Sequence, residues 1–188
     1  MKKTICIVTI IMSCLLLLCS CGSDFRMLFI ERENIANDTV LQLKEAINEN
    51  DNKALVNLFS KQAQTNSLSL DLDAQSLIDF IEGDIVEIHS QGGMSRGREA
   101  HYGKKREELR YTYVLETTEK KYQIAIKQII IDDFDVNNVG IVCISVVEDE
   151  LWNEMFPDYY YNGSRYMEYY GINIHRTVDD LLAEGWNG

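Results

Sequence analysis

Residues 108–117 read ELRYTYVLET and residues 122–132 read YQIAIKQIIID, and these two stretches decide the fold. In both, apolar or aromatic side chains recur at every second position, which is typical of a strand buried on one face. The positions concerned are Leu109, Tyr111, Tyr113, Leu115, Tyr122, Ile124 and Ile126. Because only the polar segment 118–120 separates the two stretches, we expect neighbouring antiparallel strands joined by a hairpin turn.

Two further strands flank this pair in the sequence. Residues 85–90 alternate and predict a first strand, while residues 139–147 form a short, β-branched apolar run that predicts a fourth. Between the first and second strands, residues 91–103 contain four glycines, and the stretch is basic through Arg96, Arg98 and residues 104–106, so we expect a turn and loop there.

The segment before Gly83 has the period of helices instead. A first helix is predicted over residues 31–50, a second over 53–64 after the capping segment Asn50-Asp51-Asn52, and a third begins near Asp71 or Asp73. Residues 66–72 are predicted to be a polar loop. Helices followed by four antiparallel strands make the fold class α+β, with helices packed against a curved four-stranded sheet.

The charge of the chain excludes one class of function. Its 188 residues carry 18 Lys and Arg against 30 Asp and Glu, a formal net charge of −12. Nucleic-acid binding requires a basic surface, so we expect no nucleic-acid partner.

The first twenty residues are predicted to form a targeting signal. Lys2 and Lys3 precede an apolar run from Ile5 to Leu18, which fits a secretory signal and is short for a membrane-spanning helix. The run ends in Leu18-Cys19-Ser20-Cys21, which resembles the lipobox of bacterial lipoproteins. This resemblance implies cleavage between Ser20 and Cys21 and a diacylglyceryl anchor on Cys21, which would hold the protein at the outer face of the cell membrane.

We therefore expect four parts: a signal peptide at 1–20, a tether at 21–30, an α+β domain at 31–150 and an aromatic-rich extension at 151–188. After processing, Cys143 would be the one cysteine besides Cys21, so no disulfide within the chain is expected. Because Cys143 lies in the apolar run 139–147, we interpret it as a buried strand residue and not as a nucleophile.

The domain resembles two known groups. Residues 45–63, EAINENDNKALVNLFSKQA, look like the opening of a cystatin-like, nuclear-transport-factor-2-like cone, in which a curved sheet wraps helices. The segments 102–104, 111–113 and 139–141 look like an uncharacterised lipoprotein family of Gram-positive bacteria, a domain of unknown function numbered 5104. That family carries no assigned chemistry.

Cones of this type often enclose a pocket, and some relatives are isomerases or dehydratases. The candidates for such a pocket are His89, Tyr111, Tyr113 and Tyr122, although tyrosines at alternating strand positions usually serve cross-strand packing. The acidic segments 132–135 and 148–150 lack the ligand spacing of a calcium loop. We therefore expect no catalytic residue, no cofactor and no metal.

Two surface segments remain as candidates for recognition. Residues 101–106, HYGKKR, form a basic island that is either a solvated loop or a contact for anionic headgroups, a wall polymer or an acidic partner. The extension is rich in tyrosine, which suits a partner surface or completion of the core. Its candidate residues are Tyr159, Tyr160, Tyr161, Tyr166, Tyr169 and Tyr170.

The sequence thus predicts a cell-envelope lipoprotein that binds an envelope protein or a small ligand at the membrane surface without catalysis. Two alternatives stay open: a small-molecule enzyme that uses a cone pocket, and an accessory structural subunit of an envelope complex.

Overall fold

The computed structural model describes residues 31–152 and 170–176. The chain divides into two compact units, residues 1–40 and 41–188, which are taken separately. In the first unit, residues 31–40 are helical, with Ala36 and Val40 buried. In the second unit, residues 41–48 continue as helix, and α2 (Asn52–Asn57), α3 (Lys61–Asn66) and α4 (Leu70–Phe80) follow. No helix among the described residues is long and apolar enough to cross a bilayer.

The predicted helix over 53–64 is two helices. The first ends at Asn57, and Ser60 caps α3 by accepting a hydrogen bond from the Ala63 amide at 3.1 Å. The break arises because the backbone here pairs with a strand: the Ser60 amide donates to Ile141 O at 2.9 Å, and the Ile141 amide donates to Leu58 O at 3.0 Å. Tertiary hydrogen bonds therefore override a continuous helical pattern.

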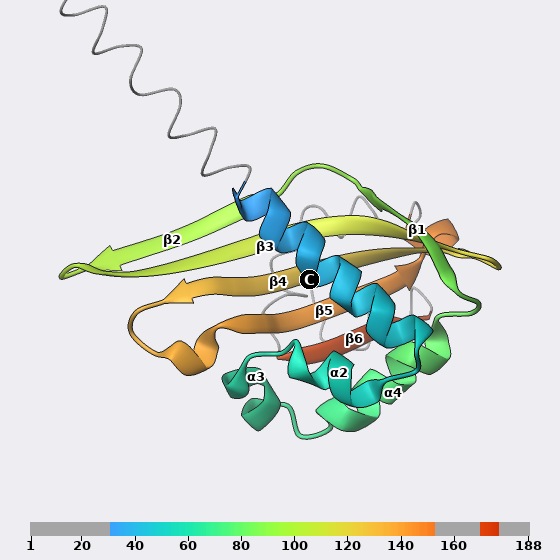
Figure 1. Cartoon of the computed structure of the whole chain (residues 1–188), viewed down its shortest axis with the longest axis horizontal. Helices are drawn as coiled ribbons and strands as arrows, with labels where there is room; N and C mark the ends of the chain where they lie inside the picture. The colour runs from blue at the N-terminus through green and yellow to red at the C-terminus, as the bar shows by residue number, and fades with distance from the viewer. Residues whose placement is uncertain (1–30, 153–169, 177–188) are drawn as a thin grey trace, which may run out of the picture. The chain divides into compact units, whose positions relative to one another are not determined.

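The sheet has six strands, two more than predicted. They are β1 (Ile85–Ser90), β2 (Ser95–His101), β3 (Lys104–Thr117), β4 (Lys121–Asp132), β5 (Gly140–Glu148) and β6 (Gly171–His175). Their order is β1-β3-β4-β5-β6, and β2 pairs with the first half of β3, beside the part that pairs with β1 (Figure 1). The four predicted strands are all present within two residues of their expected bounds, except that β3 begins at Lys104.

Two expectations about the sheet were wrong. The segment 91–103 was predicted as a loop, but it contains β2, whose seven residues are all exposed and so show no burial alternation. The sheet was predicted to be entirely antiparallel, but β6 runs parallel to β5, with Ile144 opposite Ile172.

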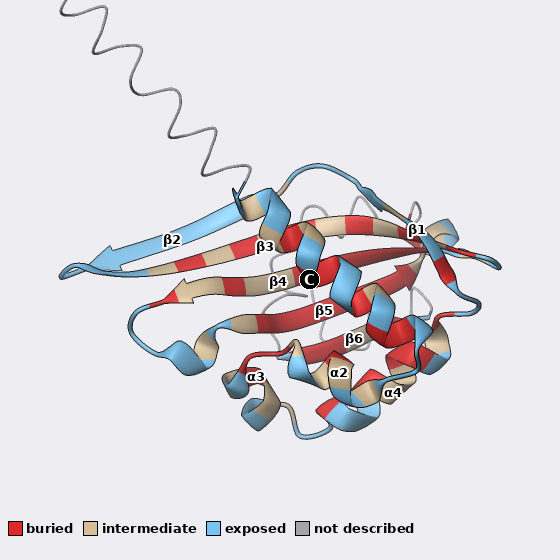
Figure 2. Cartoon of the chain, viewed as in Figure 1, coloured by how far each residue is buried: buried red, intermediate tan, exposed pale blue. Residues whose placement is uncertain are grey.

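Within the second unit, α3 and α4 pack against one face of the sheet, which we call the helical face. Tyr122 marks it, because its ring packs edge-on against Phe80 of α4 with 5.4 Å between centroids. By register, Tyr113 and Tyr111 lie on the same face as Ile124 and Ile126. On the opposite face Gln123 and Ser145 are buried too, so β4 and β5 are covered on both sides along part of their length (Figure 2).

Candidate functional site

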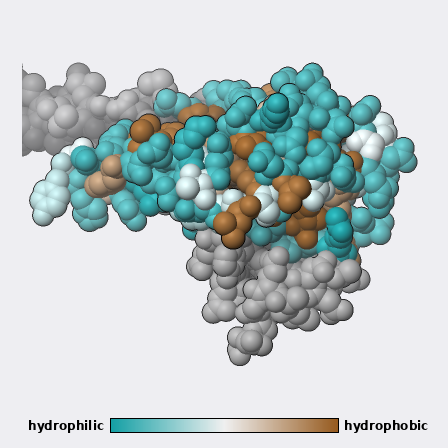
Figure 3. All heavy atoms as spheres, turned by 90° about the horizontal axis from the view of Figure 1, so that it is seen from below, coloured by the Kyte–Doolittle hydropathy of each residue, from teal (hydrophilic) through white to brown (hydrophobic). Residues whose placement is uncertain are grey.

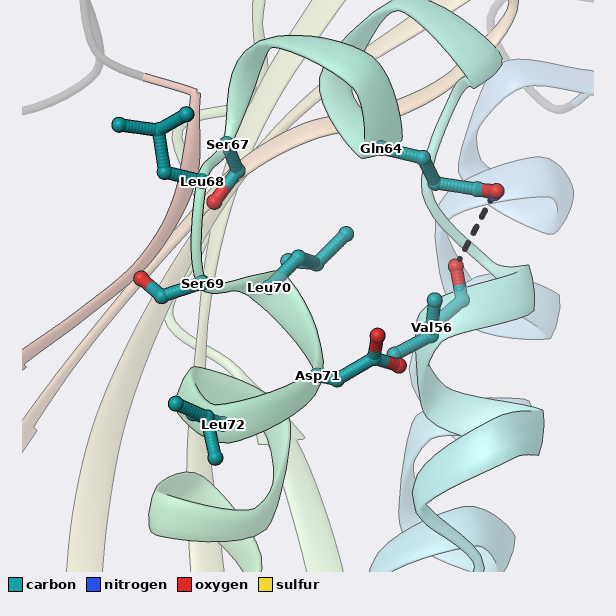
Figure 4. Close-up of a pocket in the computed structure, with 8 residues that line it drawn as sticks. All are labelled: Val56, Gln64, Ser67, Leu68, Ser69, Leu70, Asp71 and Leu72. Carbon is teal, nitrogen blue, oxygen red and sulfur yellow. Dashed lines mark hydrogen bonds between the residues drawn. The ribbon is translucent and has the colours of Figure 1, made fainter.

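The helical layer forms a hollow of about 420 Å³ at α2, α3 and the start of α4, which we call the α2–α4 hollow (Figure 4). It lies in the segment predicted as a polar loop and in the helices on either side. Its lining residues are Val56, Gln64, Ser67, Leu68, Ser69, Leu70, Asp71 and Leu72.

Hydrogen bonds between the helices fix the walls of the α2–α4 hollow. The Gln64 side-chain amide donates to Val56 O at 3.2 Å and to Phe59 O at 2.8 Å, which ties α3 to the end of α2. The Asn52 amide at the start of α2 donates to Asp71 O at 2.7 Å and ties α2 to α4. These hydrogen bonds hold the three helices in place around the hollow, and a ligand in the hollow need not break them.

The rim of the hollow carries both apolar side chains and oxygen acceptors. Leu68 is fully exposed and Leu72 is 72% exposed, and hydrophobic side chains are visible on this face in Figure 3. Ser67, Ser69 and the Asp71 carboxylate supply oxygen atoms beside them. Such a rim suits a ligand with an apolar body and a hydrogen-bond donor or a positive charge.

Sequence reasoning missed this site. Its signal was Leu68, Leu70 and Leu72, three large apolar residues within the segment 66–72 that was predicted as a polar loop.

The three tyrosines proposed as pocket residues lie together on the helical face and are buried. The Tyr122 hydroxyl donates to Phe80 O at 3.2 Å and accepts from the Glu82 amide at 2.9 Å. Burial raises the pKa of this hydroxyl. Tyr111 bonds Gln128 through its hydroxyl at 2.7 Å, and the rings of Tyr111 and Tyr113 pack edge to face at 5.8 Å. Their contacts are those of core packing.

His89, the fourth candidate, lies on the other face of the sheet, because it pairs with Val114. Its Nε2 is 3.0 Å from Glu87 Oε2 and 4.0 Å from Glu116 Oε2, so three possible metal ligands gather at this surface. Lys121 Nζ, however, is 2.8 Å from the same Glu116 oxygen, and its hydrogen bond lowers the pKa of that carboxyl. A side-chain cation thus already neutralises one ligand.

Cys143 is fully buried in β5, as predicted. Asn173 of β6 donates a hydrogen bond to its sulfur at 3.3 Å, and the neighbouring Ser145 hydroxyl lies 2.9 Å from His175 Nε2. These polar contacts join β5 to β6 on the face opposite the helices.

The acidic segment 132–135 turns the chain at the end of β4. The Asp132 carboxylate accepts from the Phe134 and Asp135 amides at 2.9 and 3.0 Å and from the Asn138 side chain at 2.9 Å. Burial alone would raise the pKa of Asp132, but these hydrogen bonds and the nearby Arg106 outweigh it and lower the pKa. The carboxylate oxygens are therefore engaged by the chain itself.

A second hollow, of about 450 Å³, lies among charged side chains at residues 119–121 and 148–150. Lys120 Nζ bridges it, at 2.8 Å from Glu82 and 3.2 Å from Glu148, and these contacts raise the pKa of the lysine. Because Lys120 is already paired with two carboxylates, this second hollow is a weaker candidate for a ligand site than the α2–α4 hollow.

Residues 42–149 match the sequence profile described as a domain of unknown function, DUF5104. The chain belongs to the DUF5104 family. The matched region of the DUF5104 domain runs from the helix over residues 41–48 through β5, and it contains the α2–α4 hollow. No curated protein matches the chain.

The remaining predicted sites fall largely outside the described residues. These are the cleavage site at Ser20 and Cys21 and the tyrosines at 159–161, 166 and 169. Tyr170 is described and is 40% exposed, directly before β6.

Proposed function

We propose that this DUF5104 protein is a lipoprotein held at the outer face of the cell membrane, where its α+β domain binds a ligand or partner without catalysis. The anchor is proposed on Cys21, as a diacylglyceryl group. We further propose that the domain belongs to the cystatin-like, nuclear-transport-factor-2-like class of cones.

The anchoring rests on the sequence. The tetrad Leu18-Cys19-Ser20-Cys21 directly follows an apolar run that begins after two lysines, which is the arrangement of a lipoprotein signal. An apolar residue at 18 and a small residue at 20 stand at the positions that the lipobox requires before the modified cysteine.

The binding function rests on one observation, the α2–α4 hollow with two exposed leucines at its rim. Large aliphatic side chains exposed to this degree cost free energy in water unless a partner covers them, and adjacent acceptor groups give such a contact direction. The occupant that fits is a ligand or peptide segment with an apolar side chain next to an amine or guanidinium group. The acidic net charge of the chain favours the same partner.

The contacts of the tyrosines support a non-catalytic role. A general acid or base must reach the substrate with a suitably shifted pKa. The Tyr122 hydroxyl is buried and bonded to the backbone of residues 80 and 82, with a pKa raised further from neutrality.

Metabolic labelling with a fatty-acid analogue tests the anchor. Wild-type protein should incorporate the label and Cys21→Ser should not, whereas Cys19→Ser should still be labelled. Equal labelling of the wild type and Cys21→Ser would refute the lipid anchor.

Site-directed photocrosslinking in native membranes tests the binding site. A benzoylphenylalanine at position 68 should give a discrete adduct, and the same group at position 86, where Val86 is also exposed, should not. Replacing Asp71 with Asn should weaken the adduct at position 68 if a positive group is bound. No adduct at position 68, or the same adduct from both positions, contradicts the proposal.

A further inference from the structure

The β2–β3 hairpin ends in a two-residue turn with an uncommon residue at its tip. His101 pairs with Lys104, so Tyr102 and Gly103 alone connect the strands. Both have positive φ, 51° and 79°, as a type I′ turn requires. Asn, Asp or Gly is the usual first residue of such a turn, because a bulky side chain is strained in the left-handed conformation.

No packing contact with the described residues compensates for that strain. Tyr102 is fully exposed, and β2 is exposed along its whole length, so the ring buries no area against the domain (Figure 2). A strained, exposed aromatic residue is typical of a contact with something outside the chain. Tyrosine in particular has an apolar ring and a polar hydroxyl, which suits the boundary between lipid headgroups and water.

The side chains around the tip are basic on an acidic protein. Residues 95–106 contain five Lys and Arg and one Glu, against a net charge of −12 for the chain. Two of these cations are paired, Arg96 with Glu107 and Arg106 with Asp132. Arg98, Lys104 and Lys105 make no ion pair with any residue that the structure describes.

A second aromatic residue lies next to the basic side chains. Lys104 Nζ stands 5.7 Å from the centre of the Phe134 ring, and Phe134 is 45% exposed. The loop that carries Phe134 is fastened to β3, since the Lys105 amide donates to the Asp133 carboxylate at 3.0 Å and the Asp133 amide returns a bond to Lys105 O at 2.9 Å. The Asp133 carboxylate is thereby held beside Lys105, in the second residue pair from the turn.

We infer that the β2–β3 hairpin docks end-on against a bilayer that contains anionic lipids, with Tyr102 at the headgroup level and Arg98, Lys104 and Lys105 on the headgroup phosphates. This inference deepens the proposed function, because a lipid on Cys21 would leave only nine residues before the helix at residue 31. Such a tether spans at most about 30 Å when fully extended. The acidic remainder of the domain is repelled by the same surface, which favours the hairpin as the part that meets it.

Fluorescence quenching in vesicles tests this docking with the full-length chain, without lipidation at Cys21. A reporter is introduced by Tyr102→Trp, and its signal is taken as the difference from the parent chain, because Trp152 and Trp186 are present in both. The vesicles contain lipids brominated near the headgroup, in phosphatidylcholine alone or mixed with phosphatidylglycerol. A matched reporter, Leu72→Trp, is placed at a position of α4 that is 72% exposed.

We expect the reporter at position 102 to lose most of its emission and shift to the blue in the anionic vesicles only. Combining it with Lys104→Gln and Lys105→Gln should abolish the loss, and the reporter at position 72 should be unaffected in both vesicles. The proposal is overturned if position 102 is not quenched in anionic vesicles, or if the quenching survives removal of the lysines. It is equally overturned if soluble polyphosphate shifts the emission while vesicles do not, since the partner would then be a polyanion and not a bilayer. Because Cys21 takes no part in the readout, failure here is separate from failure of the lipid anchor.

Discussion

Replacing Gly140 with alanine should be among the most damaging small changes in the domain. Gly140 has a φ of +130°, and a Cβ built there would lie 2.7 Å from Ser60 N and 2.9 Å from Ser60 Cα. Those backbone atoms belong to the junction at which β5 pairs with the chain between α2 and α3. Both atoms that the added methyl group would meet are backbone atoms, and backbone cannot move aside as a flexible side chain would.

The cost has two parts. Holding an L-residue in this region of φ costs about 1–3 kcal/mol. Relieving the overlap requires the junction to open, and it contains two backbone hydrogen bonds, from Ser60 N to Ile141 O and from Ile141 N to Leu58 O, each with a net value of about 1 kcal/mol. We expect a loss of about 3–5 kcal/mol in the free energy of unfolding, a large part of what a domain of this size has.

Gly93→Ala is the matched control. Gly93 also has a positive φ, +76°, but nothing lies within 4 Å of the position of an added Cβ, so only the backbone strain of about 1 kcal/mol applies. Urea unfolding followed by far-ultraviolet circular dichroism gives both values. With a slope of about 2 kcal/mol/M, Gly140→Ala should lower the midpoint by about 2 M and Gly93→Ala by about 0.5 M. Equal shifts for the two variants would refute the argument, because the close approach to Ser60 would then contribute nothing.

Four further changes have defined outcomes. Tyr122→Phe removes the hydroxyl that bonds Phe80 O and the Glu82 amide, and it should cost about 1–3 kcal/mol by urea unfolding with little change in far-ultraviolet dichroism; an unchanged midpoint would mean that water replaces the hydroxyl. Asp132→Asn should be destabilising at pH 7 and less so in acid: the lowered pKa of Asp132 means that the charged form stabilises the fold above the usual value of 3.8, and this contribution is lost as the pH falls through the folded-state pKa. If thermal melts show the same loss of stability for Asp132→Asn at every pH from 7 to 3, the charged form of Asp132 does not stabilise the fold in this way. Tyr102→Asn relieves the left-handed strain and should raise stability by about 0.5–1 kcal/mol while weakening vesicle contact, so a lower melting temperature would count against the strain. Cys143→Ala should cost about 1 kcal/mol through lost packing, and a thiol reagent should label native Cys143 slowly; rapid labelling would show that the sulfur is accessible.

Much of the fold follows from the sequence alone, since an element that is half-buried carries the period of its own backbone. The alternation in residues 108–117 and 122–132 predicts β3 and β4, the apolar run at 139–147 predicts β5, and the three- and four-residue spacing before Gly83 predicts helix. The burial of Cys143 follows from the same run. The lipobox at Leu18–Cys21 is also local, because it is recognised as linear sequence, and its lipidation stays a prediction.

What only the tertiary structure decided concerns segments whose state depends on a neighbour. β2 is entirely exposed and has no apolar alternation, so it is a strand only because the first half of β3 offers it backbone partners. β6 pairs in parallel with β5 across an interval of more than twenty residues, a distance at which no local pattern specifies a partner. The predicted second helix is interrupted at residues 58–60 because the backbone there pairs with Ile141 of β5. The α2–α4 hollow depends on that break. His89 lies on the opposite face from the tyrosines because the register between two strands sets the face to which each side chain points.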